Sequence, residues 1–339
     1  MPRRESVQAT AAAFMHEPGG RNAPCHFSFH LFGTNTVRRR RLSHASIAGP
    51  LMSGTASDAR PLPVRTSPVP FTIAAILPEP ATAMQALWGL EALARQLPAA
   101  RLVAAHIQVD PRSYAAGQEE TDLQLMRTAT EGSVAERAAA TRRIFDAWSR
   151  SAGSIGTRTM WHETMGSEET AISEFAAQVD MIVLARPRNL DSRDAFHAAI
   201  FSHRLVLVIP ETKSSASTFC QHVAVGWNQA KEVDHVVLQA LPVLRLAERV
   251  TLISIDGGNP DPVHDYMMRA LEEVGVRSEL KTVRTRNAIA PTLLDEARKI
   301  GAQALLMGAY RHGQLWEQIV GGITREVVQN SPIPVFLAH

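Results

Sequence analysis

The sequence has few of the features that mark specialised protein classes. Among 339 residues there are two cysteines, Cys25 and Cys220, and no CxxC pair. This excludes a disulfide scaffold and is typical of a reducing compartment. No apolar run approaches the 18 residues that a membrane span needs. We therefore expect a soluble, cytoplasmic protein with no membrane partner.

Catalytic and metal-binding signatures are lacking as well. The sequence contains no GxSxG, HExxH, Walker A or GxGxxG motif, and its histidines are scattered. The stretch Cys25-His26-Phe27-Ser28-Phe29-His30 places three ligand-type residues close together, but no second cluster completes a tetrahedral zinc site. We expect neither an enzyme nor a metal cofactor.

Positive charge is concentrated at the N-terminus. Residues 1–66 hold nine arginines and three acidic residues, a net +6, whereas residues 67–339 carry a net −4. Arg38 to Arg41 lie among Gly, Pro, Ser and Ala without periodicity, which predicts a disordered basic extension over residues 1–67. A dispensable tail, or a start misassigned upstream of Met52, is the favoured interpretation. A transit peptide and nucleic-acid contact are the alternatives, and we expect no nucleic-acid partner.

From residue 68 onward the sequence follows one plan twice. In the first round, apolar runs predict buried strands, a polar-alternating stretch predicts an edge strand, and amphipathic spacing predicts helices. Ser133 and Glu136 form a capping box ahead of a helix whose Phe145 and Trp148 can face the sheet, and Ser167 caps another helix. The predicted strands are 71–77, 102–109, 157–163, 181–185 and 205–209, with a helix over 82–97.

The second round repeats this order. Gly275 and Gly301 stand where glycines end helices. The predicted strands are 223–227, 250–255, 278–283, 304–307 and 335–337, and the helices are 232–249, 263–274 and 291–300. Helices that alternate with short apolar strands predict an α/β fold, here two tandem five-stranded, mostly parallel, doubly wound (Rossmann-like) domains with a sheet each. They span residues 68–210 and 219–339, joined by a polar linker over 211–218.

A glycine-containing segment near the C-terminus is the best candidate for a binding site. An apolar strand ends at Gly308, a loop containing Arg311 leads to Gly321 and Gly322, and Thr324 lies in the first turn of a helix. A strand, a backbone-exposing loop and a helix N-terminus present N–H groups and a positive dipole to an anion, as in phosphate sites.

The same segment resembles the C-terminal signature of the universal stress protein family. Gly308 begins the signature, Arg311 stands where a second glycine is expected, and nine residues then lead to Gly321 and Gly322. The resemblance covers about residues 68–339 in the tandem form of the family. It implies a non-catalytic binding or sensor protein in stress response, with an adenine nucleotide, ATP, in the second domain. An interaction protein that has lost nucleotide binding, or a weak ATP hydrolase, are the alternatives.

Two positions leave the nucleotide interpretation open. Three interpretations of Arg311 are open. It is a solvated surface residue, it marks a remodelled loop that does not bind nucleotide, or its guanidinium binds phosphate. Family members that bind ATP place an Asp at the end of the second domain's first strand, where this chain has Trp227 and Asn228. Asn228 either bonds an adenine edge or forms an Asx turn, and Trp227 either stacks on the base or belongs to the core.

The first domain departs further from the signature. It has no glycine from residue 167 through 210, and 21 positions separate Ala185 from Val206, against 27 between Gly308 and Val335. We predict that it binds no nucleotide. Because both last strands are apolar, we expect the domains to pack through them as an intramolecular pseudo-dimer; a homodimer is also possible on the family resemblance.

Overall fold

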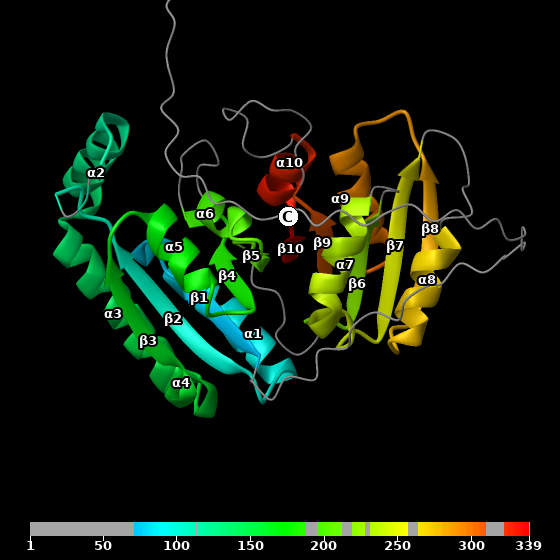
Figure 1. Ribbon diagram of the computed structural model, residues 1–339, viewed down its shortest axis with the longest axis horizontal. Helices are drawn as coiled ribbons and strands as arrows, with labels where there is room; N and C mark the ends of the chain where they lie inside the picture. The colour runs from blue at the N-terminus through cyan, green and yellow to red at the C-terminus, as the bar shows by residue number, and fades with distance from the viewer. Residues whose placement is uncertain are drawn as a thin grey trace, which may run out of the picture. The chain divides into compact units, whose positions relative to one another are not determined.

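The computed structural model describes residues 71–112, 114, 116–187, 195–211, 219–227, 231–256, 264–309 and 322–338 (Figure 1). All of them belong to one compact unit, residues 65–339. The predicted N-terminal extension lies outside the described residues, and so does nearly all of the predicted linker. The candidate site residues Asn228, Arg311 and Gly321 lie outside them too.

Strands and helices alternate along the first half. Its elements are β1 (Thr72–Ile76), α1 (Pro80–Gln96), β2 (Arg101–Gln108), α2 (Gln118–Glu131), α3 (Val134–Ser151), α4 (Ser154–Arg158), β3 (Met160–Met165), α5 (Glu168–Ala176), β4 (Met181–Ala185), α6 (Ala195–Phe201) and β5 (Leu205–Ile209). The capping box at Ser133 and Glu136 is present, and the Ser167 hydroxyl accepts a hydrogen bond from the Thr170 amide, so both predicted caps are confirmed.

The second half has the same plan. Its elements are β6 (His222–Trp227), α7 (Lys231–Leu244), β7 (Arg249–Asp256), α8 (His264–Glu273), β8 (Ser278–Arg284), α9 (Ile289–Lys299), β9 (Ala304–Gly308), α10 (Gly322–Asn330) and β10 (Val335–Ala338). Gly275 and Gly301 have positive φ angles of 82° and 69°, the left-handed conformation of a helix-ending glycine, as predicted.

The ten strands form one sheet in the order β3-β2-β1-β4-β5-β10-β9-β6-β7-β8. Within each half all pairs are parallel and follow the same order, which confirms the predicted α/β fold class. The two sets of five strands share this sheet instead of forming one each. They meet where β5 and β10 pair antiparallel, with Leu207 opposite Phe336. Pairing covers two apolar strands that would otherwise be open edges.

Helices cover both faces of the sheet (Figure 1). Side chains of α1, α3, α7 and α8 join one buried apolar cluster with alternate strand residues. Those of α5, α6, α9 and α10 join a second cluster on the other face. Strands β4, β5 and β10 are buried and apolar at every position, without polar alternation, because both of their faces are covered.

Four elements differ from the sequence prediction. Helices α2 and α4 were not predicted, because α2 has few inward apolar residues and α4 is a single turn. Strand β3 begins at Met160 rather than residue 157, since α4 occupies 154–158. Helix α7 ends at Leu244, not at 249, and β7 already begins at Arg249.

Candidate functional site

The carboxyl end of β9 and the start of α10 form the part of the predicted site that the structure describes. Gly308 ends β9 opposite Ala338, and the next amide, of Ala309, donates to the Ala338 carbonyl at 2.8 Å. Thr324 is buried, so it anchors the first turn of α10 rather than facing outward. A Cβ placed on Gly322 would meet no atom within 4 Å. The first turn of α10 is therefore open at Gly322.

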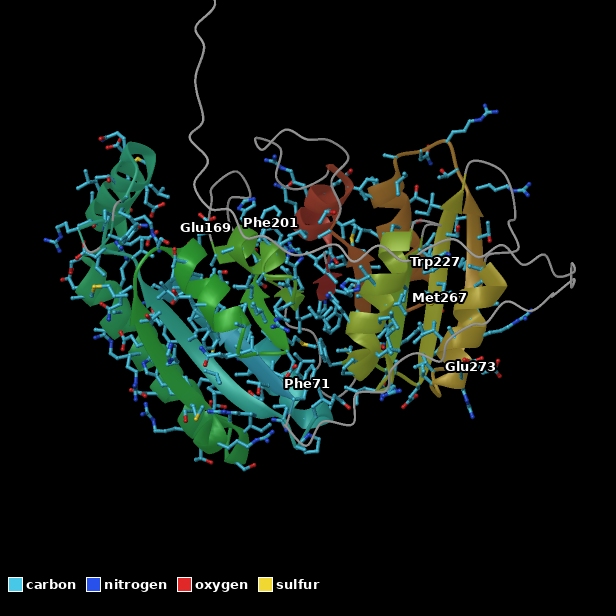
Figure 2. The ribbon with its side chains drawn as sticks, viewed as in Figure 1. Phe71, Glu169, Phe201, Trp227, Met267 and Glu273 are labelled. Atoms are coloured by element: carbon cyan, nitrogen blue, oxygen red, sulfur yellow. The ribbon has the colours of Figure 1, made fainter. Side chains whose placement is uncertain are left out.

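Strand β6 lies between β9 and β7 and runs parallel to both, so its carboxyl end lies at the same edge of the sheet. Trp227 ends β6 and is 5% exposed, packed in the cluster that also holds Met267 of α8 (Figure 2). Its indole Nε1–H has no hydrogen-bond partner among the residues that the structure describes. A buried donor without an acceptor is costly and uncommon in proteins. The sequence did not predict this orphan donor.

The corresponding position of the first half is built differently. Ala185 ends β4 opposite Ile209, 24 positions later, whereas Gly308 and its partner Ala338 are 30 positions apart. Arg186 follows, and its guanidinium donates to the carbonyl of Ser331 in the second half. Burial lowers the pKa of Arg186, while Glu211 opposes that shift. An arginine bridge between the halves therefore stands where the second half has Ala309.

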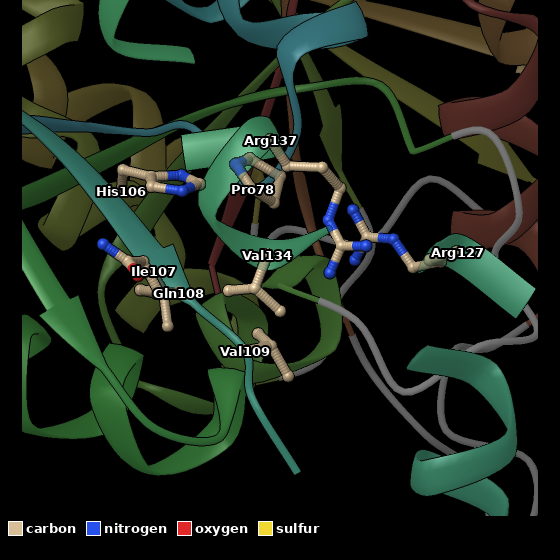
Figure 3. A pocket seen from close by; sticks show the side chains of 8 residues that line it. All are labelled: Pro78, His106, Ile107, Gln108, Val109, Arg127, Val134 and Arg137. Carbon is tan, nitrogen blue, oxygen red and sulfur yellow. The ribbon is translucent and has the colours of Figure 1, made fainter. Parts of the chain in front are cut away.

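A separate polar pocket lies at the carboxyl ends of β1 and β2, under α2 and beside α3 (Figure 3). The cavity measures about 10 Å³, room for roughly one water molecule. Arg127 of α2 and Arg137 of α3 line it, together with His106 of β2. The His106 Nδ1 lies 2.7 Å from the Leu77 carbonyl, to which it donates. Burial lowers the pKa of His106, and Arg127 and Arg137 lower it further.

Neither a metal cluster nor a membrane span is found in the described part of the chain. No group of three or more His, Cys, Asp or Glu side chains there is arranged to hold a metal ion. None of the described helices is long and apolar enough to cross a membrane.

The comparisons with known proteins agree with the second half's topology. Residues 221–339 match the sequence model of the Universal stress protein family. The second half is therefore similar in sequence to universal stress protein domains. The match covers strands β6 to β10 and includes Trp227, Gly308, Gly322 and Thr324. A search of curated proteins found no match.

Solved structures with similar folds include several universal stress proteins. One from Archaeoglobus fulgidus DSM 4304 is 11% identical, with a TM-score of 0.57, and the alignment covers 78% of this chain and 95% of that one. A putative universal stress protein from Pseudomonas aeruginosa UCBPP-PA14 is 14% identical, with a TM-score of 0.46 and coverage of 79% and 92%. A third, from Archaeoglobus fulgidus in complex with dAMP, is 14% identical, with a TM-score of 0.28 and coverage of 36% and 98%. At 11% identity, the similarity to the structure from Archaeoglobus fulgidus DSM 4304 shows only that the two proteins share a fold, and it extends over both halves of this chain.

Proposed function

We propose that this protein is a non-catalytic binding protein of the universal stress class that takes ATP in its second half. The observation that carries the proposal is the position of Gly308 at the end of β9, together with the open start of α10 at Gly322. A helix N-terminus attracts phosphate through its free N–H groups and its dipole. This geometry lies in the half that matches the family's sequence model.

The orphan indole of Trp227 supports a nucleotide at the same edge of the sheet. Its Nε1–H is buried without an acceptor in the described part of the chain, at the strand end directly before Asn228. A ring nitrogen or ribose hydroxyl of a nucleotide would supply the acceptor that the protein does not. Binding would then offset part of the desolvation cost that the free protein carries.

In this proposal the first half has a structural role. Its β5 pairs with β10, and Arg186 bonds to the Ser331 carbonyl, so the halves act as an intramolecular pseudo-dimer with one nucleotide site. The shorter β4-to-β5 connection leaves less chain for a phosphate loop. Nucleotide occupancy of the second half would be the signal in stress response, read by a protein partner rather than by turnover.

Equilibrium binding of ATP to the full chain, measured by calorimetry, tests the proposal. Gly322→Ala adds a methyl group that meets no protein atom within 4 Å, so it should leave stability unchanged but weaken ATP binding about tenfold by crowding a phosphate. Gly117→Ala is the matched control, because Gly117 also lies at the start of a helix and is equally open. It should bind ATP like the wild type.

Arg311→Gly separates the roles left open for that residue. Tighter ATP binding would mean that the arginine obstructs the site, and weaker binding that it contacts phosphate. Wild-type binding weaker than about 1 mM, roughly −4 kcal/mol, would contradict the proposal and favour the interaction protein without nucleotide. Release of ADP and phosphate during incubation with ATP would contradict the non-catalytic role.

A further inference from the structure

Helix α2 exposes apolar side chains and buries a polar one, the reverse of an ordinary surface helix. Leu125 and Met126 are 63% and 61% exposed, whereas Gln124 beside them is only 4% exposed. A helix that packs on a globular core normally turns its apolar stripe inward. The inner side of α2 therefore lines a polar space, and the sequence pattern alone did not reveal it.

Gln124 and α3 together hold a buried cation in that space. Arg137 is 5% exposed. Its Nη2 donates to the Gln124 Oε1 at 3.0 Å and its Nη1 to the Gly132 carbonyl at 2.9 Å. Both acceptors are neutral, and no carboxylate of the described residues is hydrogen-bonded to Arg137. Burying a charge whose hydrogen-bond acceptors are all neutral is costly, so the site favours an added negative charge at the guanidinium.

A second guanidinium faces the first across the pocket. Arg127 reaches in from α2, and in Figure 3 the two guanidinium groups point toward one another. Arg127 already bonds Glu131 through Nε at 3.1 Å and lies 4.0 Å from Glu79. Burial lowers the pKa of Arg137 most and the like charge of Arg127 lowers it further, while the charges of Glu131 and Glu168 oppose the shift. Repulsion between two cations is removed when an anion lies between them.

The size of the cavity limits what can enter. About 10 Å³ accommodates one oxygen-sized atom, and the apolar side chains of Pro78, Val109 and Val134 line the remainder. A ligand would insert one oxygen between the guanidiniums and leave its other atoms in the pocket mouth. Tetrahedral oxyanions suit this geometry because arginine's planar donors match phosphate oxygens.

We infer that Arg127 and Arg137 form a binding site for phosphate or a phosphate monoester in the first half of the molecule. The site is separate from the proposed nucleotide site, since it is built by β1, β2, α2 and α3 alone. It needs no glycine loop, because side-chain donors replace backbone N–H groups.

Calorimetric titration of the full chain with inorganic phosphate, against chloride at matched ionic strength, tests this site. We expect saturable phosphate binding and a raised melting temperature, neither produced by chloride. Arg137→Gln and Arg127→Gln should each weaken binding about tenfold or more, as loss of a charged hydrogen bond does. Arg143→Gln, an exposed arginine on the same helix as Arg137, should change nothing. AMP competing with phosphate would identify a monoester ligand, and its failure to compete would identify the free ion.

Three results would overturn the inference. These are phosphate binding no stronger than chloride, unchanged affinity in Arg127→Gln, and loss of phosphate binding in Gly322→Ala, which would place phosphate in the second half. If Arg137→Gln fails to fold, Arg127→Gln decides alone, because Arg127 is the more exposed of the two. Failure of ATP binding with retained phosphate binding would contradict the proposed function while leaving this inference intact.

Discussion

At the scale of single residues, we expect two of the buried histidines, His106 and His222, to make the molecule sensitive to acid. His106 donates from Nδ1 to the Leu77 carbonyl, and His222 bonds through Nε2 to the Thr251 hydroxyl at 2.8 Å. Burial is the largest cause that lowers each pKa. Both side chains are therefore neutral in the folded protein at a pH where the unfolded chain begins to take up protons.

We predict that the free energy of unfolding falls as pH decreases from about 7.5 to 5.5. Below the unfolded-state pKa of about 6.5 the unfolded chain binds protons that His106 and His222 do not yet bind when folded, so protonation favours unfolding. Urea denaturation at several pH values measures the slope. His106→Gln should flatten it, and His106→Gln with His222→Gln should flatten it more. Equal wild-type stability at pH 5.5 and 7.5 would contradict this account.

At the scale of elements, the close approach of α1 to the sheet depends on Gly89. A Cβ there would lie 2.5 Å from Cγ1 of Ile209 and 2.9 Å from Cγ1 of Val183. Both neighbouring side chains are buried, Ile209 in β5 and Val183 in β4, so neither can move freely. The helix must shift outward to accept any larger residue.

Gly89→Ala should therefore destabilise the protein despite alanine's better helix propensity. Overpacking of this kind costs about 1–3 kcal/mol, against a gain of up to about 1 kcal/mol from propensity. Chemical denaturation followed by circular dichroism measures the difference. Gly322→Ala, where a Cβ meets nothing within 4 Å, is the control and should remain within about 0.5 kcal/mol of wild type. A stabilised Gly89→Ala protein would show that α1 packs less closely than described.

At the scale of the whole molecule, the antiparallel strand pair β5 and β10 joins the two halves of the sheet. Phe336 of β10 is 0% exposed, lies opposite Leu207 of β5, and contacts Phe219 at a ring-centroid distance of 6.3 Å. The apolar cluster that includes it continues from the first half into the second. Such continuity predicts cooperative unfolding of the two halves.

Phe336→Ala should lower the stability of both halves together, by about 3–5 kcal/mol for a fully buried phenylalanine. Hydrogen exchange of β1 and β4 amides reports on the first half, and that of β6 and β7 on the second. We expect both sets to exchange faster in the variant. Faster exchange confined to the second half would show that the halves unfold independently, as two domains.

The sequence by itself determined the local features of this protein. Apolar runs gave the strands, the caps at Ser133 and Ser167 placed helix starts, and Gly275 and Gly301 placed helix ends, because each depends on residues a few positions apart. The glycine-containing segment that begins at Gly308 could also be recognised from the sequence, because its pattern is local.

Only the tertiary structure decided which distant groups meet. The β5–β10 pair joins strands more than 120 positions apart, and no local pattern specifies a partner at that distance. The inward polar side of α2 and the orphan donor of Trp227 arise likewise from what packs around them. An arginine such as Arg137 is indistinguishable from a solvated one in sequence, because its burial and its neutral hydrogen-bond acceptors are properties of its surroundings in space.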